Sequence, residues 1–239
     1  MIKVAEKASK ILIRDFGELE KLQVSDKSPN DFVKNSALKV EKIIIEEIRK
    51  ARPNYSFFNK KTGLRQFKDK KNIWIFDPIN GDKNFLHGVP HFAISIALLS
   101  HNEIISGLIF DPIKNEMFYA EKNNGAFFNN HRLRVSKKKN IEDCLFALDE
   151  RLGNKEEINI RKLGSVALDM AYVAAGRYDG LFQKNINLCE VAAGMILVKE
   201  SGGIINDLEL NNQNDFTIYA TTPDVDIKFK KITNIELEN

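Results

Sequence analysis

The chain has 239 residues, of which 43% are hydrophobic and 29% charged, and its formal net charge is +3. This composition is typical of a globular protein and excludes a chain that is mainly disordered. Basic and acidic residues are interleaved, so the charge does not by itself indicate a nucleic-acid partner. The length allows one large domain or two closely packed halves.

The cysteines and the N-terminus bear on the compartment. Cys144 and Cys189 both stand in apolar contexts, and the sequence has no CxxC motif or Cys/His cluster. We therefore expect two buried thiols in a reducing cytoplasm rather than a zinc site. Residues 1–16 carry charges every few positions and lack the apolar core of a signal peptide. No window approaches the roughly 18 apolar residues of a membrane span, so we expect a cytoplasmic protein without membrane contact.

The chain begins with helical periodicity. Apolar residues recur at helical spacing over residues 2–23, which predicts an amphipathic helix. After the turn at Ser28-Pro29, Asp31 can cap a second helix that ends before Pro53. The expected buried stripe of this second helix consists of Phe32, Val33, Ala37, Val40, Ile44 and Ile48.

From residue 73 the pattern changes to short apolar runs separated by Gly, Pro and Asn, which predicts strands. The predicted strands are 73–76, 91–99, 104–110, 116–120, 144–148, 178–183, 203–207 and 216–220, and the later helices are 165–175 and 188–201. This alternation indicates an α/β or α+β protein with a parallel or mixed sheet covered on its faces. We place a boundary in the polar connection after Leu148, so that halves 1–148 and 149–239 pack as one unit.

The most informative stretch is WIFDPINGDKNFLHGVP, residues 74–90. A buried strand is expected to deliver Asp77 at its end, Pro78 to turn the chain away, and Gly81 to permit a tight turn before a short helix. Such an arrangement suits a cation on the carboxylate and a phosphate on the free N–H groups of the helix start. An Asp-Pro turn with a purely structural role is the alternative, and the residues alone leave it open.

This stretch resembles the signature of the inositol monophosphatase family, Trp-x-x-Asp-Pro-x-Asp-Gly-Thr-x-Asn-Phe. Further segments between about Ile11 and Asp207 resemble bacterial members of the SuhB type, in family order. They are RDFGELEKLQVSDKSPNDFV, the run 52–58, EKNNGAFFNN, RKLGSVALDMAYVAAGRYDG and EVAAGMILVKESGG. The resemblance implies a layered αβαβα sandwich and Mg²⁺-dependent hydrolysis of inositol monophosphate or a similar sugar phosphate. In that chemistry, Asp and Glu side chains hold Mg²⁺, which activates the attacking water.

Position by position, the resemblance implies an altered metal site. Asp77 matches the first Asp of the signature, whereas Asn80 replaces a metal-bridging Asp and Asp82 a Thr that orients the water. Lys60 replaces a Glu that binds metal, and Glu190 replaces an Asp. Other replacements are Lys34 and Ala37 for an upstream Thr and Asp, Lys61 for a second Glu, and Gln183 for a Glu that binds substrate hydroxyls. The implied catalytic residues are Asp77, Asp82 and Lys60, the metal residues Asp77, Ile79, Asn80 and Glu190, and the phosphate- and substrate-binding residues Gly81, Asp82, Ser165 and Gln183.

These replacements change the charge that a metal would meet. The family's four carboxylates carry a formal −4, whereas Lys60, Asp77, Asn80 and Glu190 together carry −1, or −2 with Asp82. Mg²⁺ prefers hard anionic oxygens, so we expect weakened binding and impaired catalysis. Two alternatives remain open. The Lys60 ammonium could take the place of the first metal and neutralise Asp77, or Asp77, Asp82 and Glu190 could rebuild one Mg²⁺ site.

Several partners follow from the same resemblance. A phosphorylated small molecule could still bind at the Gly81 turn, near Lys60, Lys61 and Lys83, without being hydrolysed. His87 and His91 are expected to be structural. The resemblance also implies a homodimer, with a connection after Leu148 that is shorter than in the family. The alternative to a phosphatase is a non-catalytic, SuhB-like protein that acts with the transcription machinery in antitermination.

Overall fold

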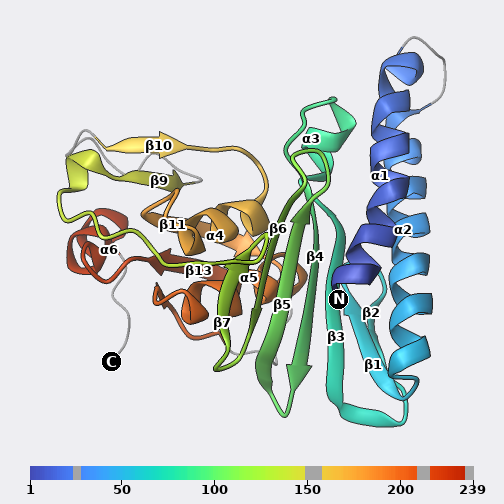
Figure 1. Ribbon diagram of the computed structural model, residues 1–239. Helices are drawn as coiled ribbons and strands as arrows, with labels where there is room; N and C mark the ends of the chain where they lie inside the picture. The colour runs from blue at the N-terminus through green and yellow to red at the C-terminus, as the bar shows by residue number, and fades with distance from the viewer. Residues whose placement is uncertain (24–27, 149–157, 209–215, 235–239) are drawn as a thin grey trace.

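The computed structural model describes residues 1–23, 28–148, 158–208 and 216–234. Five layers follow one another across the molecule (Figure 1). They are helices α1 (Ile2–Gln23) and α2 (Pro29–Ala51), a large sheet, helices α4 (Val166–Ala174) and α5 (Leu188–Glu200), a smaller sheet, and helix α6 (Asp226–Thr233). The predicted αβαβα sandwich is therefore confirmed.

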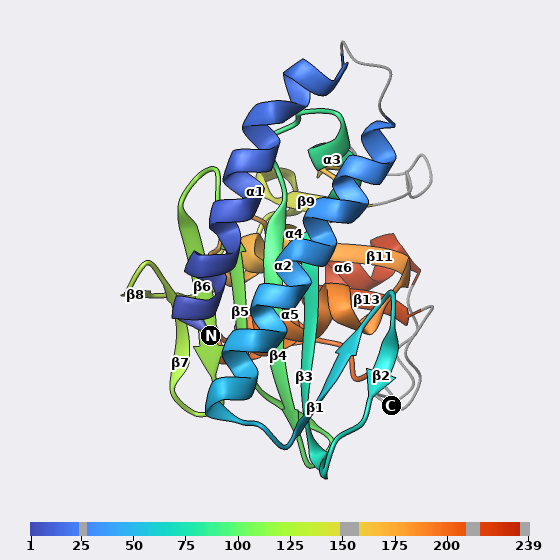
Figure 2. The same cartoon turned by 90° about the vertical axis from the view of Figure 1, so that its right-hand side faces the viewer.

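The large sheet has eight strands in the order β2-β1-β3-β4-β5-β6-β7-β8. The strands are β1 (Tyr55–Asn59), β2 (Gly63–Arg65), β3 (Asp69–Asn80), β4 (Ala93–Ser100), β5 (Glu103–Asp111), β6 (Glu116–Glu121), β7 (Gly125–Phe128) and β8 (His131–Arg132). Only β1 and β3 pair in parallel, whereas β3 to β8 form an antiparallel meander. Figure 2 looks onto the face that α1 and α2 cover.

The smaller sheet has five strands in the order β10-β9-β11-β13-β12. The strands are β9 (Leu145–Leu148), β10 (Asn159–Arg161), β11 (Gly180–Ile186), β12 (Ile204–Ile205) and β13 (Phe216–Thr221). β9 pairs in parallel with β10 and β11, and β13 pairs antiparallel with β11 and β12. The sheet is therefore mixed. The division of the chain after Leu148 stays a prediction.

Helix α5 lies at the centre of the core between the two sheets. Its sequence is apolar on all sides, as expected for a helix without a solvent-facing stripe, and most of its residues are buried. It approaches β5 so closely that a Cβ atom at Gly107 would lie 2.7 Å from the Ala193 carbonyl oxygen. It approaches α4 equally closely, since a Cβ atom at Gly194 would lie 2.6 Å from Met170 Cβ.

Most predicted elements are present, with differences at their edges. Helix α2 begins at Pro29 with Ser28 as its N-cap, so the predicted cap at Asp31 is wrong. Proline is favoured in the first helical turn because its missing N–H would have no partner there. Phe32 and Ala37 are only partly buried, whereas the polar Ser36 and Glu41 of the same helix are buried. Strands β1, β2, β7, β8 and β10 and helix α6 had not been predicted as elements.

Candidate functional site

The signature segment forms the last part of β3 and the short helix α3 (Asp82–Leu86). β3 continues past Asp77, which pairs with Ser95, to Asn80, which pairs with Ala93 after a shift of register. Pro78 has no N–H for the ladder and is accommodated within this irregularity. The prediction that the strand ends at Asp77 is therefore wrong, and the chain turns only at Gly81.

Gly81 makes the predicted tight turn. Its φ of 94° lies in the left-handed region, which glycine adopts without steric cost. A Cβ atom there would lie 2.9 Å from the carbonyl oxygen of His91. Both the backbone conformation and the close approach of the α3–β4 connection thus favour glycine at this position.

Asp77 is partly buried and is held by amide groups. Its Oδ2 accepts a hydrogen bond from Asn80 Nδ2 at 3.0 Å, and its Oδ1 accepts one from the Ile79 N–H at 3.2 Å. Burial raises the pKa of Asp77 to about 6, although the hydrogen bond from Asn80 acts in the opposite direction. The charge of Glu190 raises this pKa further and that of Lys60 lowers it, so both side chains lie within electrostatic reach of Asp77.

The Asn80 side-chain oxygen is fully occupied by protein contacts. Its Oδ1 accepts hydrogen bonds from Ser165 Oγ at 2.7 Å and from the Ala167 N–H at 3.0 Å. A carbonyl oxygen has two lone pairs, so these two donors saturate it. Asn80 is only 2% exposed. It therefore joins the end of β3 to the start of α4, where Ser165 is the N-cap.

Lys60 and Glu190 form an ion pair across the site. Lys60 Nζ lies 3.5 Å from Glu190 Oε1, and the two side chains are 65% and 20% exposed. Glu190 Oε2 accepts the Asn187 N–H at 2.8 Å and completes a capping box at the start of α5. The carboxylate that contacts the Lys60 ammonium is thus Glu190 rather than Asp77. The alternative in which Lys60 takes the place of the first metal beside Asp77 does not describe this contact.

The Asp82 carboxylate is exposed and makes a local contact. It accepts a hydrogen bond from the Lys83 N–H at 2.8 Å, at the start of α3. This N–H belongs to the helix start, whose free N–H groups we expected to face a phosphate. A bound anion would therefore compete with the Asp82 side chain for it.

A cavity of about 300 Å³ lies between α2, the β1–β2 turn and the end of β3. Of the predicted site residues, Lys60, Asp77, Ile79 and Asp82 line it, and Glu190 contacts it through Lys60. Its other polar lining residues are Lys34, Glu41, Asn59 and Lys61.

Gln183 and Ser165 are absent from the lining of this cavity. Gln183 is buried and its Nε2 donates to Asp169 Oδ2 at 3.0 Å. Ser165 reaches the site only through its hydrogen bond to Asn80.

Sequence reasoning missed Asn59, which shapes the turn that presents Lys60. Its Oδ1 accepts hydrogen bonds from the N–H groups of Lys61 and Thr62, and its Nδ2 donates to Glu41 at 3.0 Å. An Asn that hydrogen-bonds the backbone two residues later is a common turn device. The Asn-Lys-Lys-Thr-Gly run was thus a signal that could have located this turn.

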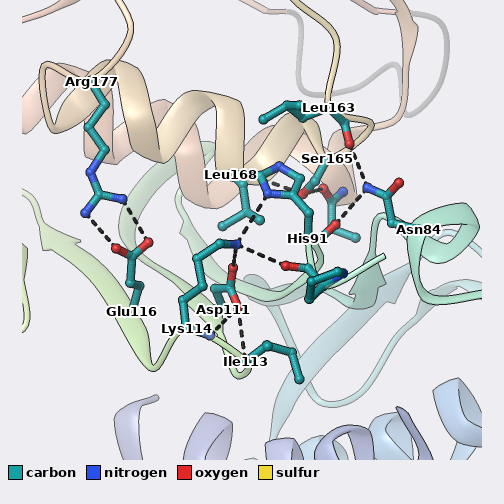
Figure 3. A network of polar contacts seen from close by, with 12 residues as sticks. Asn84, His91, Asp111, Ile113, Lys114, Glu116, Leu163, Ser165, Leu168 and Arg177 are labelled. Carbon is teal, nitrogen blue, oxygen red and sulfur yellow. Dashed lines mark hydrogen bonds and ion pairs between the residues drawn. The ribbon is translucent and has the colours of Figure 1, made fainter. Parts of the chain in front are cut away.

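His91 belongs to a separate polar network (Figure 3). Its Nδ1 lies 3.4 Å from Lys114 Nζ, which also contacts Asp111 and the Pro90 carbonyl oxygen. Burial lowers the pKa of His91 to about 4, and the charge of Lys114 acts in the same direction. These contacts fix the segment before β4 against the β5–β6 turn, which supports the structural role expected of His91.

Known proteins resemble this chain over nearly its whole length. The model of the inositol monophosphatase family matches residues 1–228. A protein named inositol-1-monophosphatase from Mesorhizobium japonicum is 40% identical over 224 residues, which cover 87% of this chain and 84% of the relative. The chain belongs to the inositol monophosphatase family.

Two SuhB proteins extend this comparison. A protein named Nus factor SuhB from Xylella fastidiosa is 36% identical over 87% of this chain and 81% of its own length. The crystal structure of the extragenic suppressor protein SuhB from Bartonella henselae superimposes with a TM-score of 0.88 at 37% identity, over 98% of each chain.

None of the helices in the described part of this chain is long and apolar enough to span a bilayer.

The inositol monophosphatase family is generally Mg²⁺-dependent, and the residues of this site fit that metal poorly. Within the described ranges, no three His, Cys, Asp or Glu side chains are grouped as they would be to hold a metal ion. The oxygen of Asn80 is saturated, Glu190 contacts Lys60, and Asp82 accepts from the backbone.

Proposed function

We propose that this protein is an inositol monophosphatase family member in which Mg²⁺-dependent hydrolysis of phosphate esters is lost or severely reduced. The observation that carries the proposal is the saturation of the buried Asn80 side-chain oxygen. A bridging metal ligand must offer a free, preferably anionic, oxygen to each ion. The Asn80 position offers a neutral oxygen that already has two donors.

Lys60 is a second, weaker obstacle to metal binding. An ammonium repels a divalent cation, but Lys60 is 65% exposed, so solvent screens the repulsion and the side chain can turn away. For Asn80, solvent cannot reach the side chain and the side chain cannot turn away, because it is buried and both its amide nitrogen and its oxygen are hydrogen-bonded. We therefore expect Asn80 to matter more than Lys60.

The remaining carboxylates give little support to a rebuilt single-metal site. Asp82 accepts from the Lys83 N–H, and Glu190 serves both the α5 capping box and Lys60. A metal would have to displace these donors, and Glu41, the other carboxylate in the cavity lining, already accepts from Asn59 at 3.0 Å.

We further propose that the cavity binds a phosphorylated small molecule without hydrolysing it. Lys34, Lys60 and Lys61 all line the cavity and can form charge-assisted hydrogen bonds to phosphate oxygens. Binding of this kind needs neither an activated water nor a metal.

A second candidate is a SuhB-like regulatory role in the cytoplasm, as a homodimer that contacts the transcription machinery. The observation that favours it is the 36% identity to a protein named Nus factor SuhB. Such a role depends on a folded surface and would survive the loss of hydrolysis.

Phosphate release from inositol 1-phosphate, with and without Mg²⁺, tests the main proposal. We expect the natural protein to release phosphate at less than about 1% of the rate of the Mesorhizobium relative. We expect the variant Lys60→Glu/Asn80→Asp/Asp82→Thr to gain at least tenfold, because it restores two anionic ligands and the hydroxyl, and EDTA to abolish the gain.

A control variant separates the site from overall charge. Lys42→Glu/Asn54→Asp/Asp224→Thr makes the same three kinds of substitution at exposed positions and should remain inactive. Hydrolysis by the natural protein at the relative's rate would refute the proposal. In the same samples, Mg²⁺ should raise the Tm of the site variant but not of the natural protein, since a ligand stabilises only a state that binds it.

A further inference from the structure

One segment concentrates positive charge. Residues 49–71 contain nine Lys and Arg and a single Asp, a net charge of +8 in a chain whose total is +3. The segment runs from the end of α2 through the β1–β2 hairpin to the start of β3. A second basic stretch, residues 122–139, has six Lys and Arg and no acid, so 49–71 is the more highly charged of the two.

Six of these cations gather at one end of the molecule, which we call the basic end. They are Arg49, Lys50, Arg52, Lys68, Lys70 and Lys71. The C-terminal end of α2, the start of β1 and the turn into β3 all lie at the lower edge of Figure 2.

Three contacts hold the basic end together. The Asp69 N–H donates to the Asn54 carbonyl oxygen at 2.9 Å, and the Arg49 guanidinium lies 5.0 Å from the centre of the Phe67 ring. The His101 N–H donates to the Lys71 carbonyl oxygen at 3.0 Å. The turn before β3 is therefore fixed to the α2–β1 connection on one side and to the β4–β5 turn on the other.

The charge of the basic end is barely neutralised. All six side chains are exposed, and only Lys50 has a carboxylate partner within the described residues, Glu47, which also binds Lys7. The carboxylate of Asp69 points to the protein, since it accepts from the Lys71 and Asn72 N–H groups and from the Asn72 side chain. Five cations thus remain available to an external anion.

The chemistry of the surface indicates which polyanion it suits. The large hydrophobic side chains that are exposed in the described structure all lie elsewhere, namely Ile2, Ile13, Leu38, Val89, Ile113, Leu163 and Ile227. A tight protein interface usually needs a buried aromatic or apolar anchor, and a helix that lies on a membrane inserts an apolar face. A phosphate backbone needs only cations, which release counterions on binding. We propose that the basic end binds the phosphate backbone of a nucleic acid without reading its bases.

Fluorescence anisotropy of labelled 20-nucleotide RNA and 20-base-pair DNA, between 50 and 200 mM NaCl, tests the inference. Since each neutralised phosphate contributes a slope of roughly −0.7 to −0.9 in log K against log salt, five engaged cations predict a slope of about −4. The variant Lys68→Glu/Lys70→Glu/Lys71→Glu should bind at least tenfold more weakly, with a slope shallower by about 2.

Lys10→Glu/Lys184→Glu/Lys199→Glu is the matched control, because it makes the same charge change at exposed positions outside the basic end and outside residues 122–139. It should retain most of the binding, as should Lys68→Arg/Lys70→Arg/Lys71→Arg. Circular dichroism checks that each variant is folded, and Lys→Gln substitutions at the same three positions replace any that is not.

Three results would overturn the inference. The first is that the natural protein fails to bind at 50 mM salt. The second is that the control variant loses as much affinity as the basic-end variant, which would show that binding depends on net charge alone. Stronger binding through the basic end to polyglutamate or to vesicles that contain phosphatidylserine would assign the surface to an acidic protein or a membrane instead.

Discussion

Asn80 changes the chemistry of the site while preserving its shape. Its amide donates to Asp77 and accepts from Ser165 and Ala167, so one neutral side chain links β3 to α4. A carboxylate at this position would face the Asp77 carboxylate across a hydrogen-bond distance. In the site that the family resemblance implies, a cation would lie between such groups; here the amide N–H group makes the link.

The substitution Asn80→Asp should therefore destabilise the protein in the absence of Mg²⁺. We expect the free energy of unfolding to fall by about 1–3 kcal/mol, because a buried donor is lost and a buried like-charge contact is gained. Urea denaturation in EDTA at pH 7.5 measures the effect. Asn72→Asp is the control, since Asn72 donates in the same way to Asp69 at 2.7 Å but in a less buried site. An equal loss in both variants would contradict the explanation.

His91 should make stability depend on pH. Burial lowers its pKa to about 4, below the unfolded value of about 6.5, so the unfolded state binds more protons between these values. Its contribution to stability is full above pH 6.5 and is lost as the pH falls towards 4. The loss by pH 4 is about 3 kcal/mol in total. Lys114, Asp111 and Glu116 all act on this group.

Urea denaturation of the natural protein and His91→Gln at pH 7.5 and pH 5 measures this contribution. Glutamine does not titrate and can still accept from Lys114. The natural protein should lose about 1–2 kcal/mol more than the variant between the two pH values. Equal losses would show that other groups control the acid response.

At the scale of elements, the approach of α5 to its neighbours should limit substitution. A Cβ atom at Gly194 would lie 2.5 Å from Met170 Sδ and 2.6 Å from Met170 Cβ. Gly194→Ala should therefore destabilise the protein by about 1–3 kcal/mol, because α4 and α5 would have to separate. Gly17→Ala in α1 is the control, since no atom lies within 4 Å of its Cβ position, and it should stabilise by up to about 1 kcal/mol. Urea denaturation of both variants tests this contrast.

Elements with a strong local pattern were predictable from the sequence, whereas short edge elements were not. Helix α5 has an uninterrupted apolar run, and β4 to β6 are separated by clear turn residues, so both groups were located correctly. Strand β2 is three residues long and β8 is two. Such strands exist because a neighbour offers hydrogen bonds, and this information is not local in the sequence.

The candidate site was predictable in its composition but not in its bonding. The resemblance gave the positions of Lys60, Asn80 and Asp82. Of the site residues that it implied, Asp77, Ile79 and Asp82 line the cavity together with Lys60. That Asn80 would be saturated by α4, or that Lys60 would contact Glu190, depends on residues 85 and 130 positions away in the sequence. Contacts of this range follow from the packing of layers, which no local pattern specifies.

At the scale of the molecule, the layers should unfold together. Both sheets pack on the shared core around α5, and Phe229 of α6 packs on the far side of the small sheet against Phe146 and Tyr219. Trp74, the single tryptophan, lies in β3 of the large sheet. Its fluorescence therefore reports on a layer that does not touch α6.

Phe229→Ala should lower the urea midpoint by the same amount when followed by Trp74 fluorescence and by circular dichroism. Removing this fully buried ring costs about 3–5 kcal/mol, and cooperative unfolding transmits the loss to the whole structure. Val225→Ala, in the same cluster, should give a smaller shift in both signals. A fluorescence midpoint that does not move would show that the large sheet unfolds independently.

The two bonds of Glu190 couple the start of a helix to the charge of the site. One carboxylate oxygen caps α5 through Asn187 and the other pairs with Lys60, a span that the shorter aspartate would not cover. Glu190→Asp alone would therefore weaken the start of α5 and release Lys60 without adding negative charge, so a shorter carboxylate at this position can serve a metal only together with changes at Lys60 and Asn80.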